Sequence, residues 1–142
     1  MKVLDSSALM AYLLGEEGTD VVGEALRDGA CCSAASWAEV AQKLRSHGRD
    51  WSMARALLQL HELRVEPVTE EDAELAARLW RKGSGLSLAD RLSLALAHRL
   101  SAPVLTADTR WGCVPPAVQI RGVVPIIRDG RAVADPSSKK LL

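Results

Sequence analysis

Four acidic residues stand out because each lies within or directly after an apolar segment of the chain. They are Asp5, Glu39, Asp90 and Asp108. Two carboxylates about 4 Å apart repel each other by about 4 kcal/mol at an effective dielectric constant of about 20. If all four met in one pocket, the summed repulsion would exceed the roughly 5–15 kcal/mol by which a small domain is stable. Some carboxyls would then have to be protonated, or a cation would have to neutralise them.

A site built only from carboxylate oxygens favours Mg²⁺ or Mn²⁺ over zinc. The three histidines, His47, His61 and His98, form no His-x-x-x-His or Cys/His signature of a zinc site. A bound Mg²⁺ or Mn²⁺ generates a hydroxide-like nucleophile from water and stabilises the charge that develops on a phosphate. The chemistry that this set of acids indicates is therefore hydrolysis of a phosphodiester.

Two of the acids also have a purely local interpretation as helix caps. Asp5 precedes the apolar run from Ala8 to Leu14 and could cap a helix there, and Asp108 could cap a short turn that begins at Thr109. Both residues, however, end predicted strands that the order of elements makes neighbours or near neighbours. Their shared position favours a common site, and the capping interpretation stays open beside it.

The other two acids have potential local partners in their own helices. Asp90 lies three residues after Ser87 and could complete a capping box. Glu39 lies four residues before Lys43, which is the favourable order for a helical ion pair. Against these interpretations, no basic residue lies three or four positions after Asp90, and Glu39 borders an apolar stripe instead of opposing it. Taken together, the four acids favour one shared pocket.

The elements that would position these acids alternate along the chain. Predicted strands cover residues 3–4, 30–32, 64–68, 103–106 and 119–123. Predicted helices cover residues 8–14, 20–27, a segment capped by Ser33 or Ser36 that stops at His47, 51–63, 69–82 and 87–100, and residues 126–127 and 131–133 would form a hairpin. The alternation predicts an α/β fold with a mostly parallel central sheet covered by helices. In such sheets, ligands bind beyond the carboxyl ends of the strands.

Length and composition fit one domain of ordinary globular type, with 142 residues and a formal net charge of zero. We expect this domain to span residues 1–134, and residues 135–142 to form a polar, flexible C-terminal tail. The zero net charge neither supports nor excludes binding to nucleic acid, because local charge patches matter more than the total.

The cysteines and the apolar segments indicate a cytoplasmic protein. Cys31, Cys32 and Cys113 form no Cys-x-x-Cys pair, and we expect buried, reduced thiols that suit a reducing compartment. No apolar stretch reaches the roughly 20 residues of a membrane span. No signal-peptide cleavage pattern follows the N-terminus. We therefore expect no contact with a membrane.

Four segments of the sequence, taken in order, resemble the motifs of a known family. They are Val3–Leu9 (VLDSSAL), Ala38–Val40 (AEV), Leu86–Asp90 (LSLAD) with the alanine-rich helix that follows, and Pro103–Trp111 (PVLTADTRW). Their order, spacing and local sequence are similar to those of PIN-domain proteins, and in particular of the VapC-type toxins of toxin–antitoxin pairs. The resemblance covers residues 1 to about 127, and all four acidic positions are intact.

The resemblance implies a Rossmann-like α/β/α sandwich and a Mg²⁺- or Mn²⁺-dependent endoribonuclease. It implies that Asp5, Asp90 and Asp108 bind the metal ion, and that Glu39 either binds it or orients a water molecule. All four acids are then candidate catalytic residues. Proteins of this family usually form homodimers and are inhibited by a small antitoxin protein, which typically inserts a peptide, often with an arginine, into the acidic pocket.

Three residues beside the motifs have candidate supporting roles. The hydroxyls of Ser7 and Thr106 could hold an acidic side chain or a metal-bound water in place, with a local backbone bond as the alternative. Arg110 directly follows the fourth motif's Asp108-Thr109 pair and is the first choice for a contact with RNA phosphates.

Two other functions remain open at this point. The chain could be a non-catalytic PIN-like module that binds RNA or a protein without cutting. A small-molecule phosphatase on a similar sheet is less favoured. Haloacid-dehalogenase-type phosphatases usually carry a second Asp two positions after the nucleophile, where this chain has Ser7.

Overall fold

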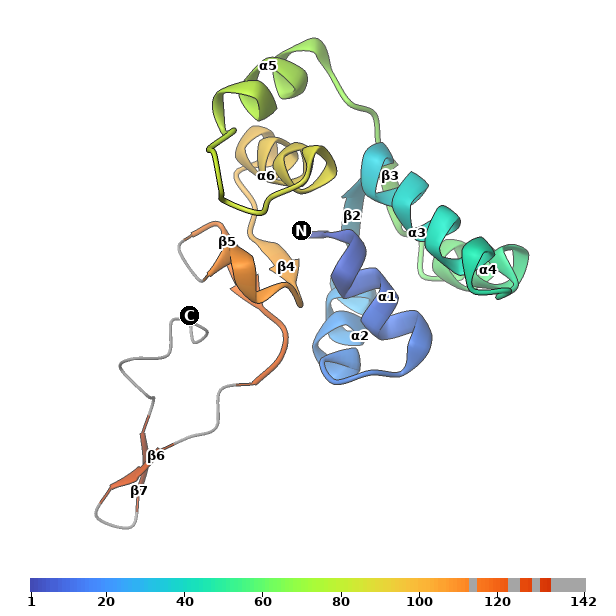
Figure 1. The fold of residues 1–142 in the computed structure, drawn as a ribbon. Coiled ribbons are helices and arrows are strands. Elements are labelled where there is room, and N and C mark those ends of the chain that lie inside the picture. Colours follow the sequence, from blue (N-terminus) through green and yellow to red (C-terminus); the bar gives the residue numbers. More distant parts are fainter. Residues whose placement is uncertain (113–114, 123–125, 129–130, 134–142) are drawn as a thin grey trace.

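The computed structural model describes residues 1–112, 115–122, 126–128 and 131–133, and its centre is a five-stranded sheet (Figure 1). The strands are β1 (Lys2–Leu4), β2 (Ala30–Ser33), β3 (Arg64–Glu66), β4 (Val104–Thr106) and β5 (Ala117–Gln119). Their order across the sheet is β3-β2-β1-β4-β5, and every neighbouring pair is parallel. The predicted α/β fold with a parallel central sheet is confirmed.

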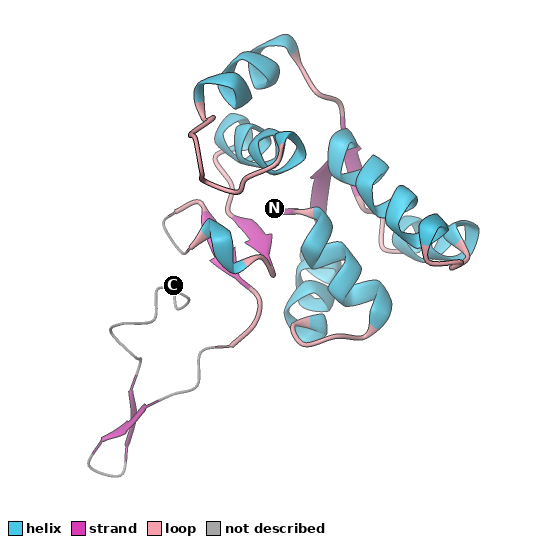
Figure 2. Ribbon diagram, in the orientation of Figure 1, coloured by secondary structure: helices cyan, strands magenta, loops and turns pink. Residues whose placement is uncertain are grey.

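Helices connect the strands and cover the sheet (Figure 2). They are α1 (Ser6–Leu14), α2 (Thr19–Asp28), α3 (Ala34–Ser46), α4 (Trp51–Leu60), α5 (Glu70–Arg78) and α6 (Leu88–Leu100), with a short 3₁₀ helix η1 (Thr109–Trp111) after β4. Each α-helix begins within two residues of its predicted start. The starts were predictable because most of these helices have a polar side chain as the N-cap, namely Asp5, Ser33, Asp50, Thr69 and Ser87.

Alternate residues of each strand pack on opposite faces of the sheet, as the two-residue period of a strand requires. Leu4 and Leu105 belong to the core that contains α1 and α2. Val3 and Val104 belong to a second core that contains α6. The strands β1 and β4 are therefore buried on both faces and form the rigid centre of the domain.

The two cysteines of β2 are buried, free thiols. Burial raises the pKa of Cys31 to about 11 and that of Cys32 to about 12. Both thiols therefore stay protonated and unreactive at neutral pH. The prediction of buried thiols is confirmed for these two residues, and Cys113 lies outside the described residues.

Two predicted strands differ from the observed ones at their ends. The last strand was predicted at residues 119–123, but β5 spans Ala117–Gln119, so the predicted strand began two residues too late and shares only Gln119 with β5. Gln119 pairs with Thr106, the final residue of β4. Likewise β3 ends at Glu66, which pairs with Ser33, the final residue of β2. A strand extends only as far as its partner strand supplies backbone hydrogen bonds. The residue at which a strand ends therefore cannot be predicted from that strand's own sequence.

Two predicted helices also extend too far. The fourth helix ends at Leu60 instead of residue 63, and the fifth ends at Arg78 instead of residue 82. Glu62 has a φ of 57°, a left-handed conformation that stops α4 and turns the chain into β3.

The C-terminal part contains a second, two-stranded sheet. Strands β6 (Ile126–Arg128) and β7 (Arg131–Val133) are antiparallel, with Ile126 opposite Val133. The predicted hairpin pairing is confirmed. Its turn and the predicted tail at 135–142 lie outside the described residues, so the domain boundary at residue 134 stays a prediction. Within the described ranges, no helix has both the length and the apolar character needed to cross a membrane.

A buried hydrogen bond joins α3 to α6, the helices that carry Glu39 and Asp90. The Oγ atoms of Ser36 and Ser93 are 2.9 Å apart, and these residues are 1% and 0% exposed. Each serine lies three residues from the acid on its own helix, so each pair shares a helix face. The contact therefore fixes how the two helices meet close to both acids.

We expect Ser36→Ala to lower the free energy of unfolding by about 1–3 kcal/mol, because the buried Ser93 hydroxyl loses its partner. The double variant Ser36→Ala/Ser93→Ala should lose less than the sum of the two single changes, since both polar groups are then gone. Urea denaturation measures these differences, with Ser52→Ala on the exposed side of α4 as the control. Additive losses in the double variant would contradict the coupling.

Candidate active site

The candidate site lies at the carboxyl ends of β1 and β4, where the strand order reverses direction. From β1 the chain continues to β2 and β3 on one side, and β4 lies on the other side of β1. Ligands of open α/β sheets bind at such a switch point. Asp5 directly follows β1, Asp108 lies two residues beyond β4, and the Asp5 N–H donates to the Leu105 carbonyl over 3.2 Å. The prediction that the strands before these two acids are neighbours is confirmed.

Asp5 is the most buried of the four acids, with 1% of its surface exposed. Its Oδ1 accepts hydrogen bonds from the Ala8 N–H at 2.8 Å and from Ser7 Oγ at 2.7 Å, and its Oδ2 accepts one from Thr106 Oγ1 at 2.5 Å. Burial raises the pKa of Asp5 to about 6, the hydrogen bonds oppose this rise, and the charge of Asp90 adds to it. At neutral pH the fold therefore holds a buried negative charge that lacks a full counter-charge.

The hydroxyls of Ser7 and Thr106 connect the ends of the two strands. Ser7 Oγ accepts the Ala107 N–H at 2.9 Å, and Thr106 Oγ1 accepts the Asp108 N–H at 3.0 Å. The two hydroxyl oxygens are 3.2 Å apart. Each hydroxyl thus donates to Asp5 while it accepts from the backbone that follows β4. Both side chains hold Asp5 in a fixed position relative to the loop that carries Asp108.

Asp108 is partly buried, and Arg110 binds both of its carboxylate oxygens. Oδ1 accepts hydrogen bonds from the Arg110 backbone N–H at 2.9 Å and from Nε at 3.0 Å, and Oδ2 accepts one from Nη2 at 2.7 Å. The Arg110 side chain is the main reason why the pKa of Asp108 lies below its usual value, and the charge of Lys43 acts in the same direction. Asp108 is therefore ionised at neutral pH.

Asp90 completes the predicted capping box with Ser87. The Ser87 N–H donates to Asp90 Oδ2 at 2.8 Å, and the Asp90 N–H donates to Ser87 Oγ at 3.1 Å. Within the described residues, the other oxygen, Oδ1, makes no hydrogen bond. The negative charge of Asp90 adds to the pKa rise that burial causes at Asp5 and to the pKa rise that Asp108 causes at Arg110. Its carboxylate therefore interacts electrostatically with both residues.

Glu39 is hydrogen-bonded to the segment after β1 and not to Lys43. Ser6 Oγ donates to Glu39 Oε1 at 2.9 Å, and Ser6 is the residue next to Asp5. The alternative ion pair with Lys43 does not occur among the described hydrogen bonds and ion pairs. This contact brings α3 to the same edge of the sheet as the other acids.

The acidic groups at this edge of the sheet are carboxylates, and their oxygens are suitable ligands for a hard divalent cation. However, among the described residues no three Asp, Glu, His or Cys side chains gather closely enough to form a complete metal site. The fold brings the acids to one edge without closing them around one point. The oxygens of Asp108 in particular are engaged by Arg110.

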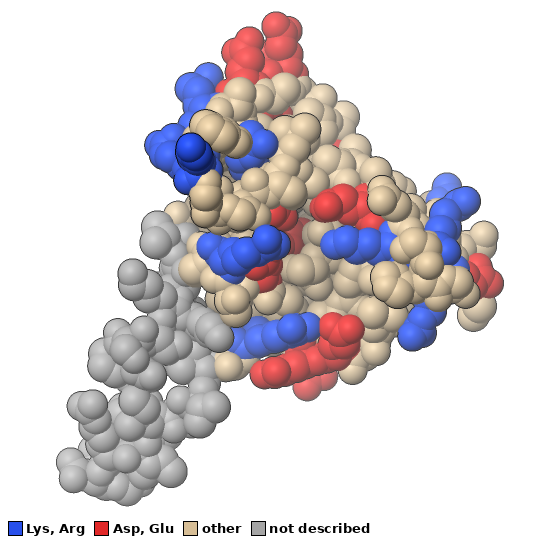
Figure 3. All heavy atoms as spheres, in the orientation of Figure 1, with Lys and Arg blue, Asp and Glu red and all other residues tan. Residues whose placement is uncertain are grey.

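Figure 3 shows acidic atoms recessed in the middle of one face, with basic groups on either side of them. The charges of two basic residues, Arg110 and Lys43, contribute to the lowered pKa of Asp108. The Arg110 side chain is 62% exposed, and Lys43 is exposed on α3. An acidic hollow with a basic rim suits a substrate that carries negative charge, because the rim attracts phosphates while the hollow attracts cations.

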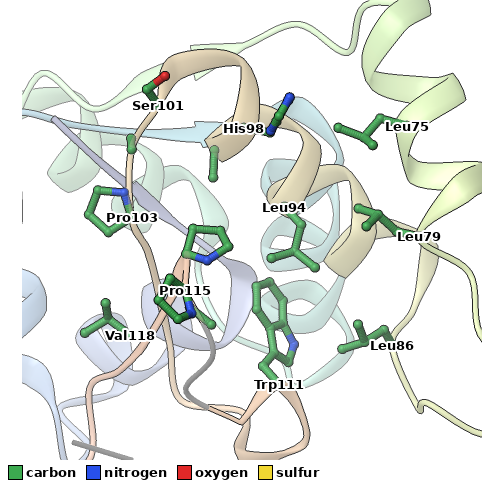
Figure 4. Close-up of a pocket in the computed structure, with 14 residues that line it drawn as sticks. Leu75, Leu79, Leu86, Leu94, His98, Ser101, Pro103, Trp111, Pro115 and Val118 are labelled. Carbon is green, nitrogen blue, oxygen red and sulfur yellow. The ribbon is translucent and has the colours of Figure 1, made fainter. Parts of the chain in front are cut away.

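A separate cavity of about 800 Å³ lies between α5, α6 and β5 and is mostly apolar (Figure 4). Leu75, Leu94 and Trp111 line it, and none of the four acids does. The Trp111 side chain is buried, and its Nε1 makes no hydrogen bond within the described part of the chain. This cavity contains no group of residues suited to hydrolysis, so it is not the candidate active site.

Sequence analysis did not identify Gln119 as part of the site. Its Nε2 donates to the Asp108 carbonyl at 2.9 Å and to the Gly112 carbonyl at 2.8 Å, and the residue is 8% exposed. It thereby fixes the backbone of the loop that carries Asp108. The one available signal was a polar residue at the end of an apolar strand. Ser6 was missed too, because nothing near it in sequence indicates its contact with Glu39.

We expect Asp5→Asn to be more stable than the wild type at neutral pH without divalent cations, by up to about 3 kcal/mol. The folded-state pKa lies above the unfolded value, so protonated Asp5 stabilises the wild type below pH 3.8, and this contribution is lost as pH rises to about 6. The advantage of the Asn variant should therefore grow across that window and then level off.

Urea unfolding in EDTA from about pH 4 to about pH 8 measures this difference. Asp20→Asn, an exposed first-turn aspartate of α2, is the matched control and should show no such growth. An advantage for Asp5→Asn that shrinks as pH rises would contradict the assignment of a raised pKa.

Comparison with known proteins identifies a matching family and several relatives. A family model for the PIN domain matches residues 2–115. A VapC ribonuclease of Mycobacterium bovis is 37% identical over 122 residues, which cover 78% of this chain and 91% of that protein. Ribonuclease VapC42 of Mycobacterium tuberculosis is 32% identical over 114 residues, which cover 72% of this chain and 87% of that protein.

Solved structures share the fold at lower identity. A toxin–antitoxin complex from Klebsiella pneumoniae has a TM-score of 0.71 at 20% identity, over 87% of this chain and all of that chain. The toxin VapC20 of Mycobacterium tuberculosis, which cleaves the sarcin–ricin loop, has a TM-score of 0.60 at 19% identity, over 75% of this chain and 88% of that one. The match to the family model and the sequence identity to these relatives show that the chain belongs to the PIN-domain family, among its VapC-type members.

Proposed function

We propose that this protein is a divalent-metal-dependent endoribonuclease and the toxin of a toxin–antitoxin pair. The observation that carries the proposal is the buried Asp5 carboxylate at the switch point of the sheet, which Thr106 joins to the backbone of Asp108 and whose pKa is raised by burial and, to a smaller extent, by the charge of Asp90. A buried carboxylate with a raised pKa in such a place is typical of a functional site. The relatives named VapC ribonucleases support RNA as the substrate.

In this proposal Asp5, Asp90 and Asp108 hold Mg²⁺ or Mn²⁺. When bound, the cation supplies activation of a water molecule and stabilisation of the negative charge that develops on the phosphate. Thr106 and Ser7 keep Asp5 ionised and correctly placed through the hydrogen bonds described above. Neutralisation by a cation would offset the cost of burying the Asp5 charge.

We propose that Glu39 orients the attacking water molecule and accepts its proton. Ser6 donates to its Oε1, which orients the carboxylate and leaves Oε2 able to accept a hydrogen bond from water. A carboxylate in that position can accept a proton as the water attacks phosphorus. The alternative role of Glu39 is direct binding of the cation, and its contact with Ser6 favours the role toward water.

The basic rim is proposed to bind the RNA backbone. Arg110 and Lys43 lie on the exposed side of the acids, and contacts of this kind position a substrate without selecting a base sequence. Their role would therefore be affinity and orientation of the phosphate, while the acids carry the chemistry.

The partners of the protein are proposed from its relatives. The Klebsiella pneumoniae structure is a toxin–antitoxin complex, and a VapBC2 structure from Rickettsia felis contains a promoter DNA fragment. We propose a small antitoxin that inhibits this chain, and a homodimer as its assembly. The buried, protonated thiols of Cys31 and Cys32 suit a reducing compartment, so we propose that the protein acts in the cytoplasm.

We expect Asp5→Asn and Asp90→Asn to reduce RNA cleavage at least about 100-fold, because each change removes one proposed cation ligand. EDTA should abolish cleavage by the wild type, and added Mg²⁺ or Mn²⁺ should restore it. Gel analysis of a labelled RNA measures both effects. Asp20→Asn is the matched control, since Asp20, like Asp90, is a first-turn aspartate but lies exposed on α2.

The same experiment distinguishes the non-catalytic alternative. RNA that is bound but never cut under any metal condition would favour a PIN-like binding module. Cleavage that survives both Asn substitutions would eliminate the proposed site, provided that circular dichroism shows all variants folded.

A further inference from the structure

The guanidinium of Arg110 occupies both oxygens of a proposed cation ligand. Nε lies 3.0 Å from Asp108 Oδ1 and 3.1 Å from Oδ2, and Nη2 lies 2.7 Å from Oδ2. Asp108 also caps η1 through the Arg110 backbone N–H. That backbone contact alone would satisfy the cap, so the three side-chain hydrogen bonds need a separate explanation.

The Arg110 side chain lies between the fourth motif and the loop before α6. A Cβ placed on Gly85 would come within 3.1 Å of Arg110 Cδ, and Gly85 has a φ of +75°. Glycine at this position leaves room for the arginine side chain. The hydrogen bonds to Asp108 are the main reason why the pKa of Arg110 is raised, and the charge of Asp90, at the start of α6, adds to the rise. The guanidinium therefore interacts directly with one acid that the proposed function assigns to a cation and electrostatically with a second.

We propose that Arg110 is a resident counter-ion of the metal-free site, which holds Asp108 until a divalent cation displaces it. The inference rests on the proposed function, because it needs Asp108 to be a cation ligand. As long as Arg110 binds both oxygens of Asp108, that carboxylate is not available to a cation.

The exposed position of Arg110 also allows its guanidinium to separate from Asp108. Its side chain is 62% exposed, so water can solvate the guanidinium as soon as it separates from Asp108. A divalent cation brings twice the charge of an arginine and accepts oxygen ligands from several acids at once. The released guanidinium stays attached beside the site and can then bind an RNA phosphate. Arg110 would thus position the substrate only after the cation is bound.

The test is the Mn²⁺ affinity of the full chain without RNA, measured by electron paramagnetic resonance of the free ion. Arg110→Ala should bind Mn²⁺ about three- to fivefold more tightly than the wild type, the range expected for one exposed charge pair. Lys43→Ala is the matched control, because Lys43 acts on Asp108 through its charge but forms no hydrogen bond with it in the described structure. Its effect should be about twofold or less, since screening weakens a charge without direct contact.

A double variant shows whether the effect acts through Asp108. Arg110→Ala in an Asp108→Asn background should give no gain over Asp108→Asn alone, because the competing pair no longer exists. An unchanged affinity in Arg110→Ala, or an equal gain in Lys43→Ala, would overturn the inference while leaving the proposed function intact. A different result would contradict the proposed function itself. If Asp5→Asn does not weaken Mn²⁺ binding, both the proposed function and this inference are wrong.

Nuclear magnetic resonance gives a second readout that does not depend on affinity. Mg²⁺ added to ¹⁵N-labelled wild type should shift the Nε–H resonance of Arg110 and speed its exchange with water. Arg121, whose Nη2 lies 2.9 Å from Glu16 on the surface, is the matched arginine and should not respond. An Arg110 resonance that is unchanged at saturating Mg²⁺ would overturn the displacement.

Discussion

The carboxylate of Asp5, buried at the end of the central strand, is the constraint on which the rest of the site depends. Water cannot screen its charge, so the protein must supply hydrogen-bond donors. One donor, Ala8 N–H, belongs to the first turn of α1, whereas Thr106 belongs to β4. Ser7 joins the two, because it donates to Asp5 and accepts from the backbone after β4. The same contacts therefore stabilise the junction of the two strands and hold the acid for chemistry.

The local and the functional interpretations of the acids turn out to be compatible. Asp5, Asp90 and Asp108 each accept a backbone N–H at the start of a helix or turn, as a capping residue does. A carboxylate has two oxygens with about four acceptor positions, so a cap uses only part of its capacity. Capping in fact helps the site, because it fixes the side-chain rotamer of each acid before any cation or substrate arrives. A capping signal near a strand end is thus no argument against catalysis.

Sequence reasoning predicted which strand ends are neighbours but not the contacts between the elements around them. The alternation of strands and helices sufficed to place Asp5 and Asp108 at neighbouring strand ends, and the caps at Thr69 and Ser87 marked two helix starts within one residue. The contacts from Ser6 to Glu39 and from Gln119 to the Asp108 carbonyl could not be predicted. They depend on how separate elements pack, which local periodicity does not encode. Strand ends were misjudged for the same reason, since a partner strand sets them.

The topology of the sheet explains why the acids lie at an open edge of the sheet and not in a closed core. The segment after β1 turns toward one face, where Ala8 packs in the core with α2, while the segment after β4 turns toward the other face, where Trp111 packs in the core with α6. The chain thus leaves two adjacent strands in opposite directions, which is how a crevice forms at the switch point of an α/β sheet. Asp5 and Asp108 follow the two strands at this point. Ser6 joins Glu39 of α3 to the segment after β1. Burial raises the pKa of Asp5, and the charge of Asp90 at the start of α6 adds to this rise. A fold without this divergence would have packed apolar groups at the same position and left no place for a cation or for a phosphate.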